Sequence, residues 1–214
     1  MSQFQFNFEQ PNELELPNAQ LRYEQNFIGH NEATQLFEHF SSSLNWTQDH
    51  IKIAGKRVLI PRLQAWYGAA NAQYQYSGIQ LIPLPWTKQL QSLRNKCADY
   101  CGENFNSVLA NLYRDGSDSV GWHADDEPEL GPEPVIASIS LGCAREFEMR
   151  HNATKQKAKI LLEHGSLLVM KGTTQKNWQH QIAKHRSIIE PRINLTFRVV
   201  DLSYNDGQKG RKKI

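Results

Sequence analysis

The sequence lacks the features that mark membrane-spanning, secreted and disulfide-stabilised proteins. No apolar run approaches the roughly 20 residues that cross a bilayer, and residues 1–10 contain neither the basic nor the apolar segment of a secretory signal. Only three cysteines occur, Cys97, Cys101 and Cys143, so they cannot all pair with one another, and the first two form a weak metal pattern with no second half. We therefore expect reduced thiols in a cytoplasmic protein, or a nuclear one if the source is eukaryotic.

Net charge is also small, so it does not by itself indicate a nucleic-acid partner. Lysine and arginine together number 24, against 22 aspartates and glutamates. Basic residues are nevertheless concentrated at 171–186 and in the tail, and such patches can contact phosphates while the whole protein stays near neutral. A solvated surface explains each patch alone equally well.

The length of 214 residues, with 39% of them hydrophobic, predicts one well-buried domain. We expect a flexible leader at 1–18, the domain at 19–203 and a basic tail at 204–214. Apolar residues at helical spacing predict a helix over 31–40, capped by Asn31, and a second over 86–102. Gly102 is expected to end the second helix.

From residue 105 onward, short alternating segments are separated by glycine, proline, aspartate and asparagine. They predict eight strands, near 105–113, 120–125, 135–141, 145–151, 157–162, 166–171, 178–183 and 192–200. Eight such strands favour a sandwich or barrel, and the jelly roll is the commonest way of closing them. The expected fold is therefore mostly β, a jelly roll with the two helices on one outer face.

Three of these strands have polar side chains at alternate positions, which places the polar side chains of each strand on one face. The three polar sets are Arg192, Asn194, Thr196 and Arg198; Asn111 and Tyr113; and His123 and Asp125. A face turned to water is the commoner explanation for any one strand. A metal-binding pair, an amide, a phenol and two arginines on three strands indicate instead a polar cavity inside the barrel.

The pair His123 and Asp125 could bind one metal ion from one side of a strand, although His-x-Asp alone is a weak pattern. A later histidine would complete the two-histidine, one-carboxylate triad that holds non-haem Fe(II) and leaves coordination positions open. The candidates for this ligand are His151, His164, His180 and His185. We prefer His180, which lies on a predicted strand. His164 falls in a predicted turn with a structural role, and His185 lies in a basic run that would repel a metal ion.

The arginines indicate which kind of iron enzyme this could be. A keto-diacid that chelates iron through one end needs a buried cation for its far carboxylate, and arginine offers a permanently charged bidentate fork. A buried arginine without such an anion is costly. We expect Arg192 to bind the far carboxylate, with a further hydrogen bond from Tyr113. Asn111 and Arg198 are expected to address the end nearer the metal.

Several ordered segments closely resemble the AlkB family of alkylated-DNA-repair dioxygenases. They are NLYRDG at 111–116, HADDE at 123–127, His180, PRINLTFR at 191–198, PRLQAWYG at 61–68 and YQYSG at 74–78. The resemblance covers roughly residues 50–200, and it is nearest to the eukaryotic-type nucleic-acid demethylase branch.

The resemblance implies a double-stranded β-helix that binds Fe(II) and uses 2-oxoglutarate as co-substrate. The implied metal ligands are His123, Asp125 and His180, and the implied 2-oxoglutarate residues are Asn111, Tyr113, Arg192, Thr196 and Arg198. The implied reaction removes alkyl groups from bases such as N1-methyladenine and N3-methylcytosine in DNA, releasing succinate, carbon dioxide and formaldehyde. No catalytic side chain beyond the metal ligands is needed, because the cofactor does the difficult chemistry.

A nucleotide-recognition lid is implied near 50–80. Tyr74 and Tyr76 resemble aromatics that touch the flipped base, and Asp126 and Glu127 resemble acidic residues beside the damaged base. Duplex-preferring relatives have a bulky aromatic where this sequence has Ala54, and a methyl group cannot replace a base in the stack. Single-stranded DNA or RNA is therefore a serious substrate, because unstacking costs less there.

Three alternatives remain open at this point. The chain could be an enzyme of the same fold acting on RNA or a protein, a zinc or manganese cupin-like enzyme, or a catalytically silent binder of damaged bases. The cupin-like alternative leaves Arg192 and Arg198 unexplained. We expect a monomer that acts on DNA, and possibly RNA, with no membrane partner.

Overall fold

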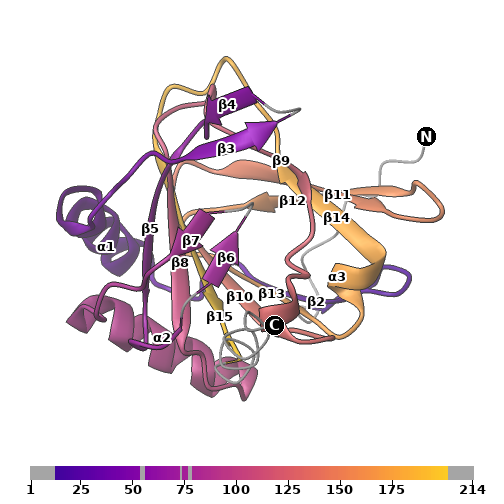
Figure 1. The fold of residues 1–214 in the computed structure, drawn as a ribbon, viewed down its shortest axis with the longest axis horizontal. Coiled ribbons are helices and arrows are strands. Elements are labelled where there is room, and N and C mark those ends of the chain that lie inside the picture. Colours follow the sequence, from indigo (N-terminus) through magenta and orange to yellow (C-terminus); the bar gives the residue numbers. More distant parts are fainter. Residues whose placement is uncertain (1–12, 54–55, 73, 77–78, 202–214) are drawn as a thin grey trace, which may run out of the picture.

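Two antiparallel β-sheets face each other in the computed structural model, which describes residues 13–53, 56–72, 74–76 and 79–201 (Figure 1). The larger sheet has the strand order β1 (Glu13–Leu14), β2 (Gln20–Glu24), β13 (Leu167–Lys171), β10 (Ile136–Gly142), β15 (Arg192–Arg198), β8 (Ser107–Tyr113) and β5 (Leu63–Gly68). The smaller sheet has the order β12 (Lys157–Leu162), β11 (Arg145–His151), β14 (Trp178–Ile182) and β9 (Val120–His123). All eight strands expected from the sequence are present, which confirms the jelly roll.

Helices and hairpins surround these sheets. The longer helices are α1 (His30–Ser43) and α2 (Lys88–Cys101), and α3 (Thr174–Asn177) is a single turn between β13 and β14. A short 3-10 turn spans Pro128–Leu130, and two hairpins pair β3 (His50–Ile53) with β4 (Lys56–Leu59) and β6 (Tyr74–Tyr76) with β7 (Ile79–Leu81). Within the described residues no helix is both long and apolar enough to cross a membrane.

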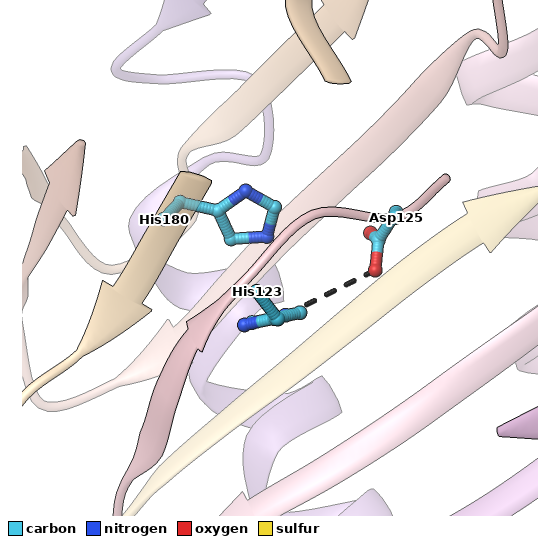
Figure 2. A group of neighbouring side chains, drawn as sticks. All are labelled: His123, Asp125 and His180. Carbon is cyan, nitrogen blue, oxygen red and sulfur yellow. Dashed lines mark ion pairs between the residues drawn. The ribbon is translucent and has the colours of Figure 1, made fainter. Parts of the chain in front are cut away.

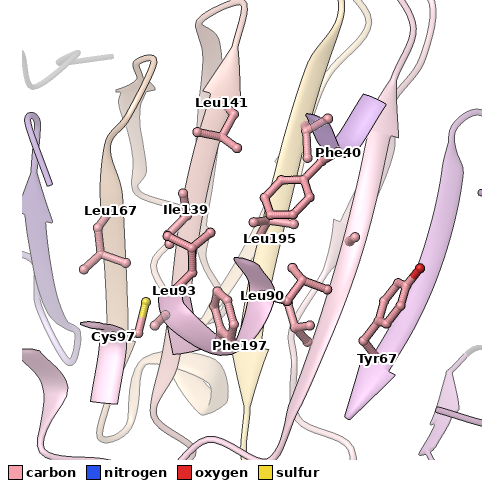
Figure 3. Packing of buried hydrophobic residues seen from close by; sticks show 14 of the residues in the cluster. Phe40, Tyr67, Leu90, Leu93, Cys97, Ile139, Leu141, Leu167, Leu195 and Phe197 are labelled. Carbon is pink, nitrogen blue, oxygen red and sulfur yellow. The ribbon is translucent and has the colours of Figure 1, made fainter. Parts of the chain in front are cut away.

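The main hydrophobic core lies between the larger sheet and the two long helices (Figures 1 and 3). Alternation along β15 directs Leu195 and Phe197 into this layer, where they are fully buried. Phe40 of α1 and Leu90 of α2 pack against the same layer. The opposite face of β15 is therefore turned toward the smaller sheet, where its polar side chains lie.

Both long helices lie where the sequence places them, but one of the expected caps is wrong. Thr87 caps α2 by accepting a hydrogen bond from the Leu90 backbone N–H at 3.2 Å, and Gly102 ends it with φ 69°. The residue before α1 is Gly29, which makes no side-chain cap bond, so Asn31 lies inside the helix instead of capping it.

The expected leader is wrong over its last residues. Glu13–Leu14 pairs with β2, and Leu14 and Leu16 are buried in a second apolar cluster between the sheets. These two leucines at alternate positions attach the segment to the sheet, although the alternation does not continue in the sequence around them. Residues 1–12 lie outside the described part of the chain.

Three tryptophans have different environments. Trp178 is fully buried and donates to the Pro17 carbonyl at 2.9 Å, and half-buried Trp46 packs against the main core. Trp122 belongs to no core cluster within the described residues. It lies on the other face of β9 from His123, beneath the Arg150 guanidinium at 4.5 Å.

Candidate metal centre and co-substrate cavity

Two histidines and one aspartate meet at the end of the cavity between the sheets. His123, the last residue of β9, is the cross-strand partner of His180 on β14, and their ring centroids are 4.3 Å apart. One ligand atom from each of His123, Asp125 and His180 lies within 4.8 Å of the others, and Figure 2 shows the three side chains side by side. This is the donor set that non-haem Fe(II) sites use.

Asp125 reaches this point from a loop, which corrects the expected strand over 120–125. The strand β9 ends at His123, and Asp125 follows two residues later. Its backbone N–H donates to Gln175 Oε1 at 3.0 Å, and its Oδ2 accepts from Arg198 Nη2 at 2.8 Å. The carboxylate is thus held from outside the strand, and parity along a strand does not account for its position.

The remaining atoms of the triad suit a cation. His123 Nδ1 faces the Gly121 carbonyl oxygen at 2.8 Å and therefore bears the proton, which leaves the Nε2 lone pair 3.9 Å from Asp125 Oδ1. Oδ1 is buried and accepts no hydrogen bond from the described residues. Metal-binding histidines typically have such a hydrogen bond at the ring nitrogen that does not bind the metal, because it fixes the tautomer.

The protonation states also favour metal binding. Burial, and then the neighbouring His123, lower the pKa of His180 to about 3, and burial lowers the pKa of His123. Burial alone would raise the pKa of Asp125, but the Arg198 guanidinium holds it well below its usual range. At neutral pH the site therefore presents two neutral imidazoles and one carboxylate, the forms that bind metals.

A polar cavity extends from the triad along the larger sheet. It is lined by Arg62, Asn111, Tyr113, Ser138, Arg192, Asn194, Thr196 and Arg198, together with apolar residues of the smaller sheet. These include every residue that the sequence assigned to the co-substrate. The polar side chains of β8 and β15 thus share one buried cavity.

Arg192 is the charged residue whose burial most needs a ligand. Only 1% of it is exposed, its Nη2 donates to Ser140 Oγ at 2.9 Å, and its guanidinium lies 5.3 Å from the Tyr113 ring centroid. Nε and Nη1 are buried without a hydrogen bond of ordinary geometry to the described residues. Burial lowers the pKa of Arg192 to about 10, far above neutral, so its charge persists. Two unsatisfied donors on a buried cation fit a carboxylate.

Arg198 has a contact that the sequence did not predict. Expected to address the end of the co-substrate nearer the metal, it donates to Asp125 and so contacts a predicted metal ligand. Both side chains are at most 4% exposed. Alternation along a strand could not predict this pairing, because Asp125 lies outside the strands.

Several cavity residues were missed at the sequence level. Arg62, part of the PRLQAWYG segment, is buried and donates from Nε to Asn111 Oδ1 at 2.8 Å. Ser138 and Ser140 lie on the cavity side of β10 and accept hydrogen bonds from Asn194 and Arg192. The alternation of serine with isoleucine and leucine in β10 would have indicated the serines. No local signal indicated Arg62.

The other histidines lie elsewhere. His164 has the structural role expected of it, because its Nδ1 accepts from the Gly142 backbone N–H at 2.8 Å. His151 Nδ1 accepts from the Thr154 N–H at 3.1 Å, and His185 is exposed. Among the described residues, His123, Asp125 and His180 form the one group whose ligand atoms converge.

Comparison with known proteins identifies the family. The model of a family described as "2OG-Fe(II) oxygenase superfamily" matches residues 20–198. The chain belongs to this superfamily. DNA oxidative demethylase ALKBH2 of Mus musculus is 38% identical over 177 residues, which cover 79% of this chain and 72% of the relative. The chain therefore belongs to the AlkB family of dioxygenases, and the family implies Fe(II) and 2-oxoglutarate.

Other relatives agree with the family. Alpha-ketoglutarate-dependent dioxygenase alkB homolog 3 of Bos taurus is 44% identical over 184 residues, covering 81% of this chain. The chain spans 64% of that relative's length. The solved structure of OsALKBH1 superposes with a TM-score of 0.61 at 17% identity, covering 90% of this chain and all of the other, and supports the fold.

The residues of this AlkB-family chain expected at the substrate are only partly described. Asp126 is exposed and Glu127 half-buried, directly after the predicted ligand Asp125. Tyr74 and Tyr76 lie on β6, whose backbone pairs with β7. Their side chains and Ala54 lie outside the described part of the structure.

Proposed function

We propose that this chain is an oxidative demethylase of N-alkylated bases in DNA. In this proposal His123, Asp125 and His180 hold Fe(II). Asn111, Tyr113, Arg192, Thr196 and Arg198 bind 2-oxoglutarate. Bound iron and 2-oxoglutarate would supply the oxidising power that hydroxylates the alkyl carbon, and formaldehyde, succinate and carbon dioxide would be the products.

The observation that carries the proposal is the pairing of two unusual groups in one cavity. A triad of neutral imidazoles and a carboxylate lies beside a buried arginine, and Arg192 has no carboxylate partner among the described residues. A metal ion alone would leave the guanidinium uncompensated, and a diacid alone would leave the triad unexplained. A metal-chelating keto-diacid satisfies both requirements.

The chain's own residues would act by position and charge. Arg192 and Tyr113 would orient the far carboxylate, and Arg62 would hold the Asn111 amide in place through the 2.8 Å hydrogen bond. Apolar side chains of the smaller sheet, such as Phe147 against the His180 ring at 4.9 Å, would exclude water from the reacting centre. No side chain needs to form a covalent bond.

Two features near the site support a damaged nucleic acid as substrate. Asp126 and Glu127 continue the chain from the metal ligand and would favour the positive charge of N1-methyladenine or N3-methylcytosine. Lys184 and Arg186 are exposed in the loop after β14, where they could contact phosphates.

The loop bearing these cations is fixed in place. Its backbone bonds to the turn after β8, from Gly116 N to Ile188 O at 2.8 Å and from His185 N to Gly116 O at 2.7 Å. A Cβ at residue 116 would lie 1.8 Å from the His185 carbonyl oxygen, so only glycine permits this approach. The cations therefore lie on a pre-formed loop.

Succinate release tests the proposal directly. The purified chain is incubated with Fe(II), 2-oxoglutarate and matched oligonucleotides that contain or lack N1-methyladenine or N3-methylcytosine. We expect succinate and formaldehyde in equal amounts, only with the methylated strands. Binding of methylated strands without succinate would identify a silent binder and contradict the proposal.

Strand preference is tested with the same lesion in single-stranded DNA, duplex DNA and RNA. Ala54 cannot fill the gap left by an extruded base, so we propose faster turnover on single-stranded DNA than on duplex. Equal or faster turnover on duplex would contradict this part alone. Faster turnover on RNA would make RNA, and not DNA, the preferred substrate and leave the chemistry unchanged.

A further inference from the structure

Gln175 is a buried residue near the metal triad that has no part in the function proposed above. It lies on the single-turn helix α3, with 2% of its surface exposed. Its Oε1 accepts the backbone N–H of Asp125 at 3.0 Å, and its Nε2 donates to Met170 Sδ at 3.4 Å. The backbone donor determines which end of the amide faces Asp125, because two N–H groups cannot pair.

Asp125 depends on this contact because it lies beyond the sheet. Neighbouring strands supply hydrogen bonds to His123 and His180, whereas Asp125 follows the end of β9. Its side chain is held at Oδ2 by Arg198 and its backbone by Gln175. Two buried partners therefore fix the loop-borne ligand at both ends, and Oδ1 is left for the metal.

The helix that bears Gln175 is itself anchored. Thr174 is buried, and its Oγ1 donates to the Lys171 carbonyl at 2.6 Å and accepts the Gln20 N–H at 2.9 Å. The far end of the helix is tied to the β11–β12 turn, where Asn152 N donates to Asn177 O at 2.7 Å. Gln175 therefore lies on a segment whose two ends are both hydrogen-bonded to neighbouring elements.

This segment also leads into the strand of the second histidine. Gln175 precedes His180 by five residues, and β14 begins directly after α3. One short stretch of chain thus bears a metal ligand and the anchor of another ligand from a distant loop. The separation between Asp125 and His180 is set through this stretch.

We propose that Gln175 is a positioning residue of the metal centre. By accepting the Asp125 N–H, it holds the carboxylate at the distance from His180 that a divalent cation requires, and so raises metal affinity. The inference rests on the proposed metal site. Partners that orient a metal ligand typically change metal affinity by about 10- to 100-fold when they are removed.

Mn(II), a redox-inert probe, tests this on the full chain without turnover. Its dissociation constant is measured by calorimetry at one pH. Gln175→Met has similar length but no acceptor oxygen, and its thioether sulfur accepts only weakly, so we expect its constant to rise about tenfold or more. Gln175→Glu keeps an acceptor oxygen, so its constant should stay near or below the wild-type value. The electron paramagnetic resonance spectrum of bound Mn(II) should change in Gln175→Met only.

A matched control is available on the neighbouring strand. Gln179 also accepts a hydrogen bond through Oε1, from Arg150 Nη2 at 2.9 Å, but on the outer face of the smaller sheet. Gln179→Met should keep the wild-type dissociation constant. If Gln175→Met does not fold, Gln175→Asn replaces it, because its amide is one methylene too short to reach Asp125.

Two results would overturn the proposal. One is a wild-type Mn(II) affinity in Gln175→Met. The other is an equal loss of affinity in Gln175→Met and Gln175→Glu, which would mean that packing and not the hydrogen bond matters. His180→Ala separates this failure from that of the metal site. If His180→Ala loses Mn(II) while Gln175→Met keeps it, only the role of Gln175 fails, and if His180→Ala binds normally, the site itself is wrong.

Discussion

The two sheets differ in where they put their polar side chains. In the larger sheet β15 is buried on both faces, with apolar residues against the helices and polar residues toward the cavity. In the smaller sheet β12, β14 and the middle of β11 mostly have apolar residues inside and polar or charged residues outside. Ile160 and Leu162, for example, point inward, while Lys159 is partly exposed.

His180 breaks the ordinary pattern of the smaller sheet. It lies on the inner face of β14 between Trp178 and Ile182, 4% exposed, among apolar neighbours. Polar groups are normally buried only with partners, because desolvation is costly. The polar face of β15 and the buried His180 on the facing sheet therefore mark the two halves of one binding site.

The largest expected effect comes from removing His180, the buried polar side chain of β14. His180→Ala should abolish Mn(II) binding and turnover, because two ligands on one edge of the sheet cannot complete the triad. Binding of a methylated oligonucleotide should persist, since the exposed cations after β14 are unchanged. Normal turnover would move the third ligand to another histidine and leave His180 without a role.

The next effect is on the polar face of the larger sheet. Arg192→Ala should weaken 2-oxoglutarate binding by about 2–5 kcal/mol, the usual cost of breaking a buried charge pair. Calorimetry of the Mn(II)-loaded protein measures this loss. Mn(II) affinity in the absence of 2-oxoglutarate is the control and should not change. An unaltered 2-oxoglutarate affinity would show that another residue binds the far carboxylate.

The opposite face of the same strand should behave differently. Leu195 is fully buried against the helices, so Leu195→Ala should cost about 2–5 kcal/mol of stability through lost burial and a cavity. Unfolding in denaturant measures this loss, and the folded fraction should bind 2-oxoglutarate as the wild type does. A weakened co-substrate affinity would show that the two faces of β15 are not independent.

The alternation on β15 explains how much of this could be predicted from sequence. Alternation along the strand alone predicted that Arg192 and Thr196 share a face, and the turn residues between strands predicted the eight strands. The anchors of Asp125 could not be predicted in this way, because Gln175 and Arg198 reach it from a helix and a strand distant in the sequence. Periodicity describes which face a residue takes within an element, and it is silent on loops that fold back onto other elements.

The smallest effect is expected on the outer face of the smaller sheet. Lys159 Nζ lies 2.8 Å from Glu146 Oε2 and 3.2 Å from Glu148 Oε1, but the lysine side chain is 37% exposed and that of Glu146 is 50% exposed. Lys159→Ala should therefore cost at most about 1 kcal/mol, less at about 1 M salt, and leave both ligand affinities unchanged.

The pH dependence of that small effect identifies its origin. The hydrogen bond to Glu146 raises the pKa of Lys159 above its ordinary value of 10.5, so its contribution is present below that value and disappears as pH rises through the folded-state pKa. Burial opposes the shift of Glu148, but Gln181 and Lys159 lower its pKa below 4.5, so its share is lost as pH falls through that lower value. The stability difference between wild type and Lys159→Ala should thus be largest between these limits. A stability difference that stays constant across both pKa values would assign the effect to packing of the lysine stem. The outer face of the smaller sheet would then be stabilised by packing, as the inner face is, and not by its charges.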